Sequence, residues 1–206
     1  GFAHNRLSII DLSKNASQPM ISQNKRYVIS FNGEIYNFKK LKNTYFKDKN
    51  FRSKGDGEVL LYLYMKFGIN FLSKIKGMFS ICIVDENLKK IFLIRDRFGI
   101  KPLYYYFNSA KHCLYFSSEI KSIFCNREIK KELNYKEAFK FFKQGLVNGS
   151  SETWFKNIFQ VKSAHYLEFD EKNINEKKYY SLEDNIDEGK DNYNYSFKSY
   201  IDKLKD

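Results

Sequence analysis

The sequence predicts an α+β fold in which two mostly antiparallel sheets carry helices on their outer sides. Short apolar segments with the composition of strands recur along the chain, and several are separated by polar turns of hairpin length. Between them lie segments whose apolar residues recur at the three- and four-residue spacing of helices. Strands followed by helices and then by further strands are typical of the α+β class.

The first part of the chain contains two predicted strands and three helical segments. These are a strand over residues 2–12, a polar loop over 13–20, a strand over 27–31, helices over 37–46 and 58–67, and a helical turn over 71–75. The second strand stops at Asn32-Gly33, a dipeptide typical of tight turns. Asp56 is the expected N-cap of the longer helix, and Gly68 ends it. That helix has one apolar stripe, formed by Val59, Leu60, Leu63 and Phe67.

After residue 77 the pattern changes to that of strands. Residues 78–84 form a nearly continuous apolar run, as expected for a strand buried on both faces. Ser117 or Ser118 caps the next predicted helix, and Asn134 and Gly145 flank another. The remaining predicted segments are strands over 90–95, 103–107, 113–116 and 165–169, and helices ending at residue 124 and over 135–143.

Beyond about residue 170 the chain is polar and charged. Residues 184–194 are interpreted as a linker, and residues 195–204 as a short helix that leads into a following domain. We therefore predict one large domain, followed by a linker and the start of another domain.

Composition excludes several classes of protein. A hydrophobic content of 43%, with 18% aromatic residues, supplies a large core rich in Phe and Tyr. The three cysteines have no paired spacing, which argues against a disulfide framework or a zinc site and favours a reducing cytoplasm. No apolar run reaches the roughly 18 residues that a membrane span needs, and no signal peptide is visible.

The formal net charge of +12 permits binding to nucleic acid or to an anionic surface. However, the lysines are spread along the chain and no nucleic-acid-binding motif accompanies them. We therefore predict a solvated basic surface, with no nucleic-acid or membrane partner. No metal site is predicted, because His4, His112 and His165 lack acidic partners at ligand spacing.

The most informative stretch runs from Tyr27 to Asn37. In it a carboxamide, a main-chain amide without a side chain and a carboxylate follow one another at Asn32, Gly33 and Glu34. A hairpin turn explains Asn-Gly alone, but it does not explain this trio at a strand end. Such a trio can bind a small polar substrate and donate hydrogen bonds to a developing oxyanion.

This stretch, Phe31-Asn-Gly-Glu-Ile-Tyr-Asn-Phe38, resembles the signature of the glutamine-hydrolysing domain of asparagine synthetases, which are class II glutamine amidotransferases. The resemblance runs from Gly1 to about Leu182. It implies the four-layer αββα sandwich of N-terminal-nucleophile hydrolases. The other matching stretches, in order, are Arg6-Leu-Ser-Ile-Ile-Asp-Leu12, Gly55-Asp-Gly-Glu-Val-Leu-Leu61, Gly77-Met-Phe79, Arg95-Asp-Arg-Phe-Gly-Ile-Lys-Pro-Leu-Tyr104 and Ser117-Ser-Glu-Ile-Lys-Ser-Ile123.

The resemblance also implies a set of site residues for glutamine hydrolysis. Asn32 and Gly33 would form the oxyanion hole, while Glu34 and Asp56 would hold the α-ammonium of glutamine. Arg6 would grip the α-carboxylate bidentately. The pocket wall would include Leu7, Ser8, Ile9 and Ile10. Taken without the resemblance, Arg6 is a surface ion-pair residue and Asp56 a plain N-cap.

The family nucleophile is an N-terminal cysteine whose own α-amine serves as the base. Position 1 here is Gly1, and Cys82, Cys113 and Cys125 lie in or after apolar segments where structural thiols are expected. We therefore expect a truncated sequence whose nucleophile lies upstream, and no glutaminase activity in the isolated chain.

Three segments depart from the family pattern or leave alternatives open. Gly55 and Gly57 flank Asp56 where the family usually has Ser or Thr before it and Thr or Cys after it, so the loop is expected to be looser. Lys162-Ser-Ala-His165 replaces a Pro-Pro-Gly turn. The alternating charges of Arg95-Asp-Arg97 indicate either a contact with the synthetase domain or ammonia passage, or a buried, charge-paired turn.

By resemblance, residues 1–182 are a glutaminase domain and residues 183–206 lead into a synthetase domain. The implied enzyme is a ligase that uses L-glutamine as the ammonia donor and ATP, with Mg²⁺, to amidate aspartate. No cofactor is expected in this domain, since ATP and Mg²⁺ belong to the downstream domain, and the 206 residues contain no Gly-rich phosphate loop. A homodimer is compatible with the resemblance. The alternatives are a glutaminase with a different acceptor, such as a surface sugar, and a non-catalytic scaffold.

Overall fold

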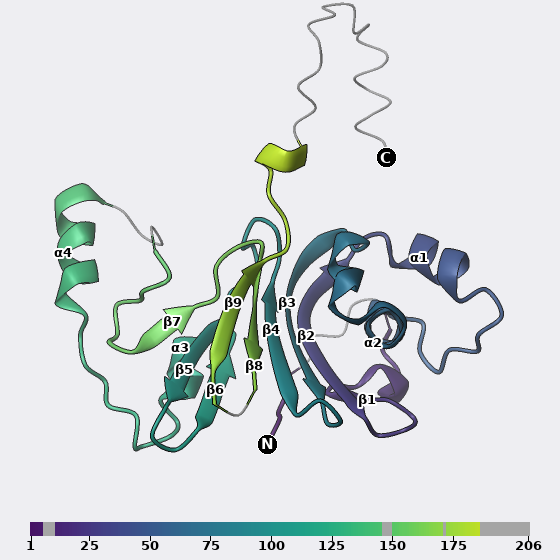
Figure 1. Ribbon diagram of the computed structural model, residues 1–206, viewed down its shortest axis with the longest axis horizontal. Helices are drawn as coiled ribbons and strands as arrows, with labels where there is room; N and C mark the ends of the chain where they lie inside the picture. Colours follow the sequence, from purple (N-terminus) through teal and green to yellow (C-terminus); the bar gives the residue numbers. More distant parts are fainter. Residues whose placement is uncertain (6–10, 146–149, 171, 186–206) are drawn as a thin grey trace, which may run out of the picture.

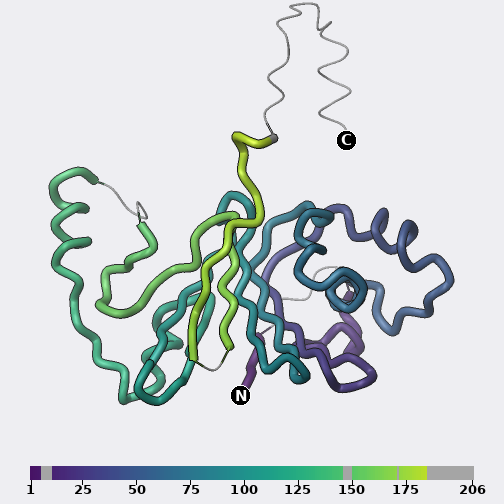
Figure 2. Tube along the Cα trace, viewed as in Figure 1, coloured from purple at the N-terminus to yellow at the C-terminus, as the bar shows by residue number. Residues whose placement is uncertain are grey.

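Two antiparallel sheets form the centre of the computed structural model, which describes residues 1–5, 11–145, 150–170 and 172–185 (Figure 1). The larger sheet has six strands in the order β1 (Met20–Ile21), β2 (Tyr27–Ile35), β3 (Gly77–Asp85), β4 (Lys90–Arg95), β8 (His165–Phe169) and β9 (Ile174–Lys178). The smaller sheet has three strands in the order β6 (Cys113–Ser117), β5 (Tyr104–Asn108) and β7 (Ile158–Gln160). Figure 2 shows how β8, late in the chain, returns to lie beside β4, and β9 pairs with β8 at the edge of the sheet.

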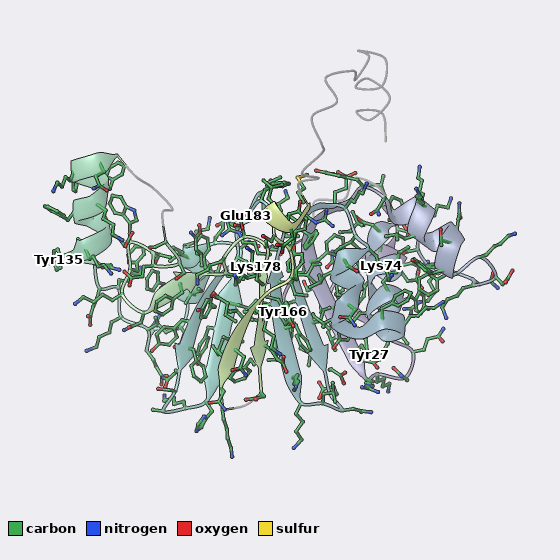
Figure 3. The ribbon with its side chains drawn as sticks, turned by 45° about the horizontal axis from the view of Figure 1, so that its top comes forward. Tyr27, Lys74, Tyr135, Tyr166, Lys178 and Glu183 are labelled. Carbon is green, nitrogen blue, oxygen red and sulfur yellow. The ribbon has the colours of Figure 1, made fainter. Side chains whose placement is uncertain are left out.

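Helices lie on the outer side of each sheet. The α-helices are α1 (Phe38–Tyr45), α2 (Asp56–Phe67), α3 (Ile120–Ile123) and α4 (Tyr135–Gln144), and the 3₁₀ segments are η1 (Lys14–Ala16), η2 (Gly68–Ser73) and η3 (Glu183–Asn185). Figure 3 shows Tyr135 of α4 at the left edge of the molecule and Tyr27 of β2 in its right half. Within the described ranges, no helix is both long enough and apolar enough to cross a membrane.

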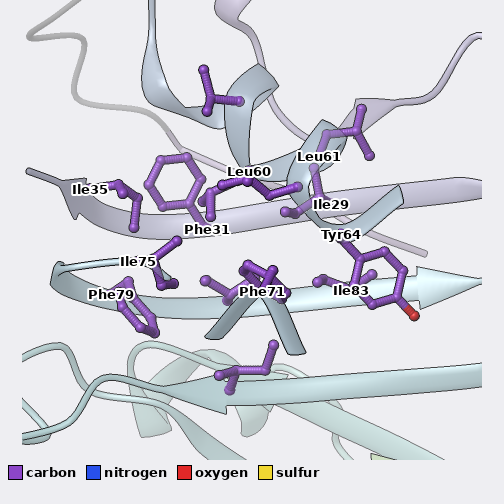
Figure 4. Packing of buried hydrophobic residues seen from close by; sticks show 14 of the residues in the cluster. Ile29, Phe31, Ile35, Leu60, Leu61, Tyr64, Phe71, Ile75, Phe79 and Ile83 are labelled. Carbon is purple, nitrogen blue, oxygen red and sulfur yellow. The ribbon is translucent and has the colours of Figure 1, made fainter. Parts of the chain in front are cut away.

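The buried side chains separate into three cores, which define the layers. The first core lies between α2 and the larger sheet, where Figure 4 shows Leu60 and Leu61 of α2 over Ile29 and Phe31 of β2. The second core lies between the sheets and consists of Cys82, Leu93, Leu103, Val161 and Leu167. The third core lies on the outer side of the smaller sheet and consists of Ile123, Ile129 and Ile158. The order helix, sheet, sheet, helix confirms the predicted α+β sandwich.

Strand β3 explains why the sequence there reads as continuously apolar. Ile81 and Ile83 belong to the core under α2, while Cys82 between them belongs to the core between the sheets. Successive side chains of a strand point to opposite faces, so a strand in the middle of such a sandwich needs apolar residues at every position.

The predicted turn at Asn32-Gly33 is wrong, because β2 continues through it to Ile35. Gly33 has φ +149° and lies opposite Phe79 of β3. A Cβ atom at Gly33 would lie 2.1 Å from the carbonyl oxygen of Met78, and one at Gly77 would lie 2.1 Å from that of Glu34. Both glycines therefore permit a close approach of β2 and β3 rather than a reversal of the chain.

Other differences lie where the sequence pattern is weak. Residues 2–5 and 11–12 form no strand, and the rest of that predicted strand lies outside the described residues. β7 and β9 were not predicted, because β7 has three residues and most of β9 is exposed. The predicted helix over 195–204 and most of the predicted linker also lie outside the described residues.

Candidate functional site

A cavity of about 1130 Å³ opens beside the first residues of the chain. Asn32, Gly33 and Glu34 of β2 line it together with Asp56 at the start of α2. Its opposite wall comes from residues 113–119 and 121–123, which belong to β6, α3 and the segment between them. The structure thus brings four of the predicted site residues to one cavity. The other five, Arg6, Leu7, Ser8, Ile9 and Ile10, lie outside the described residues.

The main-chain N–H of Gly33 faces the outer edge of β2, away from β3. Gly33 lies opposite Phe79 of β3. The N–H of Phe79 donates to the carboxylate of Asp96, in the turn after β4, and the carbonyl of Phe79 accepts from the N–H of Asp96. Phe79 therefore directs its polar groups away from β2, and the pair with Gly33 is of the kind that shares no hydrogen bonds. At the same edge, two residues further on, the N–H of Ile35 donates to Asp56. This edge of β2 borders the cavity, so the alternation of the strand indicates that the Gly33 N–H faces the cavity.

The carboxamide of Asn32 is held from the opposite wall. Its Nδ2 donates to Oγ of Ser118 at 3.3 Å. A carboxamide nitrogen carries two hydrogens, so this bond leaves one N–H for another acceptor in the cavity. Ser118, which the sequence suggested only as a helix cap, instead orients Asn32.

Asp56 is buried between the cavity and β2, with 7% of its surface exposed. Its Oδ2 accepts from the N–H of Ile35 at 2.9 Å. Burial raises the pKa of the Asp56 carboxyl, and the nearby Glu34 carboxylate raises it further, although main-chain N–H groups of Ile35, Asp56 and Gly57 oppose the shift. Two neighbouring acids at the cavity form a favourable place for a cation.

Asp56 is the first residue of α2, and Gly55 takes the N-cap position that was predicted for it. The loop before α2 is anchored by buried carboxylates despite its glycines. Asp11 accepts from the N–H of Lys54 at 2.7 Å and from that of Ser13 at 2.8 Å. No local pattern marks Asp11 for this role, because Lys54 lies far along the chain.

In the charged turn after β4, the side chains of Arg95 and Asp96 bind main-chain groups of the surrounding segments. Asp96 is 1% exposed and accepts from the N–H groups of Phe79, Phe98, Ile100 and Lys101. Arg95 donates to the carbonyls of Lys101, Gly99 and Val161 and to the side chain of Gln160. These contacts favour the structural interpretation of the turn, with the difference that the charges bind main-chain groups rather than each other.

The three cysteines differ in exposure, and only Cys82 is buried. Cys82 is buried on β3, and burial raises the pKa of its thiol well above the usual value. Cys113 is half-buried on β6 and bonds to the carbonyl of Lys111, and Cys125 is exposed after α3. A thiol that resists ionisation is a poor nucleophile, so Cys82 is unsuited to attack a substrate although it borders the cavity.

Comparison with known proteins finds relatives over most of the chain. A family model described as a glutamine amidotransferase domain matches residues 1–180. The chain is 44% identical over 191 residues to a glutamine-hydrolyzing asparagine synthetase 2 of Bacillus subtilis, covering 89% of this chain and 25% of that protein. It is 32% identical over 167 residues to the amidase chry2 of Gibberella zeae, covering 81% of this chain and 24% of that protein. The chain thus spans about a quarter of the length of these relatives.

Among solved structures, the glutamine phosphoribosylpyrophosphate amidotransferase of Bacillus subtilis matches with a TM-score of 0.57 at 20% identity, over 86% of this chain and 34% of that chain. At this identity the likeness concerns the fold alone. It confirms the predicted α+β sandwich of two antiparallel sheets with helices outside.

Proposed function

Because the chain belongs to the glutamine amidotransferase domain family, we propose that its cavity binds L-glutamine and that the side-chain amide is hydrolysed there to release ammonia. The observation that carries this proposal is the convergence of Asn32, Gly33, Glu34 and Asp56 on one cavity. Two carboxylates suit the α-ammonium of a free amino acid, and two N–H donors suit the oxygen of an amide under attack.

The reaction is an acyl transfer. A thiolate adds to the amide carbon, and the carbonyl oxygen takes up the negative charge. Asn32 Nδ2 and Gly33 N donate to that oxygen. The nitrogen then takes up the proton given up by the thiol and leaves as ammonia when the carbonyl re-forms. Water releases glutamate from the resulting thioester. We do not assign this thiolate to Cys82, Cys113 or Cys125, and we therefore expect the 206-residue chain alone to be inactive.

We further propose that the ammonia is used by a synthetase domain that binds ATP and Mg²⁺ and activates the β-carboxylate of aspartate. The 44% identity with a glutamine-hydrolyzing asparagine synthetase supports aspartate as the acceptor. The 32% identity with an amidase supports a second candidate, in which the same glutaminase serves a different acceptor. A cytoplasmic location and a homodimeric assembly remain predictions.

The proposal is tested by following the amide nitrogen of glutamine into the products. The complete gene product that contains this chain is incubated with amide-¹⁵N-glutamine, ATP, Mg²⁺ and aspartate, and the products are resolved by mass spectrometry. We expect ¹⁵N-asparagine. Release of ¹⁵N-ammonia without asparagine would favour another acceptor, and glutamine that remains intact would contradict the enzymatic proposal and favour a scaffold.

A further inference from the structure

The side chain of Gln18 forms hydrogen bonds at the edge of β2 that a residue of a neighbouring strand would otherwise form. β1 pairs with β2 only at Met20, opposite Ile29, and at Ile21, opposite Val28. Pro19 has no N–H, so the ladder does not continue through the main chain. Instead, the Gln18 carboxamide accepts from the N–H of Phe31 at 2.6 Å and donates to its carbonyl at 3.0 Å. One side chain thus supplies both hydrogen bonds of a strand pair.

This contact stands directly beside the predicted oxyanion donors. The main-chain groups of Phe31, Gly33 and Ile35 alternate onto the same edge of β2. Gln18 occupies this edge at Phe31, and Asp56 occupies it at Ile35. The Gly33 N–H lies between these two positions, and both Gln18 and Gly33 line the cavity.

We propose that Gln18 is a positioning residue for the oxyanion hole. By binding the N–H and carbonyl of Phe31, Gln18 fixes the main chain immediately before Asn32 and Gly33. It therefore also fixes the directions in which the Asn32 carboxamide and the Gly33 N–H point. The proposal rests on the proposed function, because the oxyanion forms only during glutamine hydrolysis. Gln18 has no assigned contact with the ammonium or the carboxylate of glutamine, so its loss should affect the chemical step rather than substrate binding.

The geometry predicts a specific kinetic pattern. Gln18→Glu keeps an acceptor for the Phe31 N–H but sets an oxygen against the Phe31 carbonyl, and Gln18→Met removes both bonds at similar size. We expect either change to lower kcat for glutamine hydrolysis about 10–100-fold, since small misplacements of catalytic groups cost factors of this order. KM for glutamine and the rate with free ammonia should change less than about threefold. Gln23, exposed in the turn between β1 and β2, provides the matched control Gln23→Glu.

Two measurements test this proposal, and each can contradict it independently of the other. In the complete gene product, steady-state kinetics with glutamine and with ammonia give the kcat and KM values. In the 206-residue chain, ¹⁵N NMR follows the Gly33 amide and the Asn32 side-chain amide, which should shift in the Gln18 variants and not in Gln23→Glu. Unmoved Gly33 and Asn32 resonances, or equal losses with glutamine and ammonia, would overturn the positioning role. Absence of glutamine turnover in the unsubstituted protein would instead overturn the proposed function, and the resonance shifts would still decide the role of Gln18.

Discussion

Asn32→Ala in the complete gene product is expected to lower glutamine-dependent amidation by about 10²–10³-fold, because removal of one oxyanion-hole donor typically costs this much in rate. Ammonia-dependent amidation should be unchanged, since free ammonia bypasses the glutaminase site. The structure gives a reason to expect a large loss: the Asn32 nitrogen is already held by Ser118 with one N–H left for the cavity.

The two rates are measured side by side with saturating glutamine and with ammonium. Asn43→Ala supplies the matched control, because Asn43 is exposed on α1. A parallel loss of both activities in Asn32→Ala would mean that the substitution damages the whole protein, and the assignment of Asn32 as an oxyanion donor would be wrong.

Asp56→Asn is expected to weaken glutamine binding by roughly 30-fold or more, because removing one partner of a buried charged pair costs about 2 kcal/mol or more. The asparagine keeps an oxygen that can accept from the N–H of Ile35, so the main-chain contact now made by Asp56 is retained. Asp48→Asn, at an exposed position after α1, is the matched control. Calorimetric titration with glutamine measures the affinity of each variant.

The stability of the Asp56→Asn variant separates binding from folding. The pKa of Asp56 is raised in the folded protein, mainly by burial. A carboxyl whose pKa is raised on folding stabilises the fold below its unfolded pKa, and this contribution is lost as the pH rises through the folded pKa. At pH 7 the charged form therefore disfavours folding, and the variant should be equally or more stable than the parent in urea. A less stable variant with unchanged glutamine affinity would make Asp56 purely structural.

The same titration predicts a pH dependence of binding. The α-ammonium of glutamine requires the ionised carboxylate, so affinity should fall as the pH is lowered through the raised pKa of Asp56. The Asp56→Asn variant should lack this part of the pH dependence.

Much of the fold was predictable because its strongest elements have simple physical patterns. The apolar run of β3 follows from burial on both faces, and α2 follows from its apolar stripe and the glycine at its end. The predicted turn at Asn32-Gly33 was wrong because a glycine permits either a tight turn or a close approach of two strands. Only the short distance to Met78 in the structure shows that the close approach applies here. β9 carries mostly exposed polar residues, so its strand conformation comes from pairing with β8.

The location of the candidate site was predictable in part, because one short stretch carries three of the residues that line the cavity. Asn32, Gly33 and Glu34 are adjacent, and their residue types indicate their use. Gln18 and Ser118 were not predictable as site residues, because each acts through a contact with a residue 13 or 86 positions away. A single polar residue gives no local sign of such a contact, which only the fold creates.

The binding of L-glutamine in the cavity beside β2 is tested most directly by titrating the ¹⁵N-labelled 206-residue chain with L-glutamine, using D-glutamine as the control. We predict saturable shifts of the Asn32 side-chain amide and of the Gly33, Glu34 and Asp56 main-chain amides, with L-glutamine only. Shifts confined to other parts of the chain, or equal shifts with both enantiomers, would contradict a site built to recognise this amino acid.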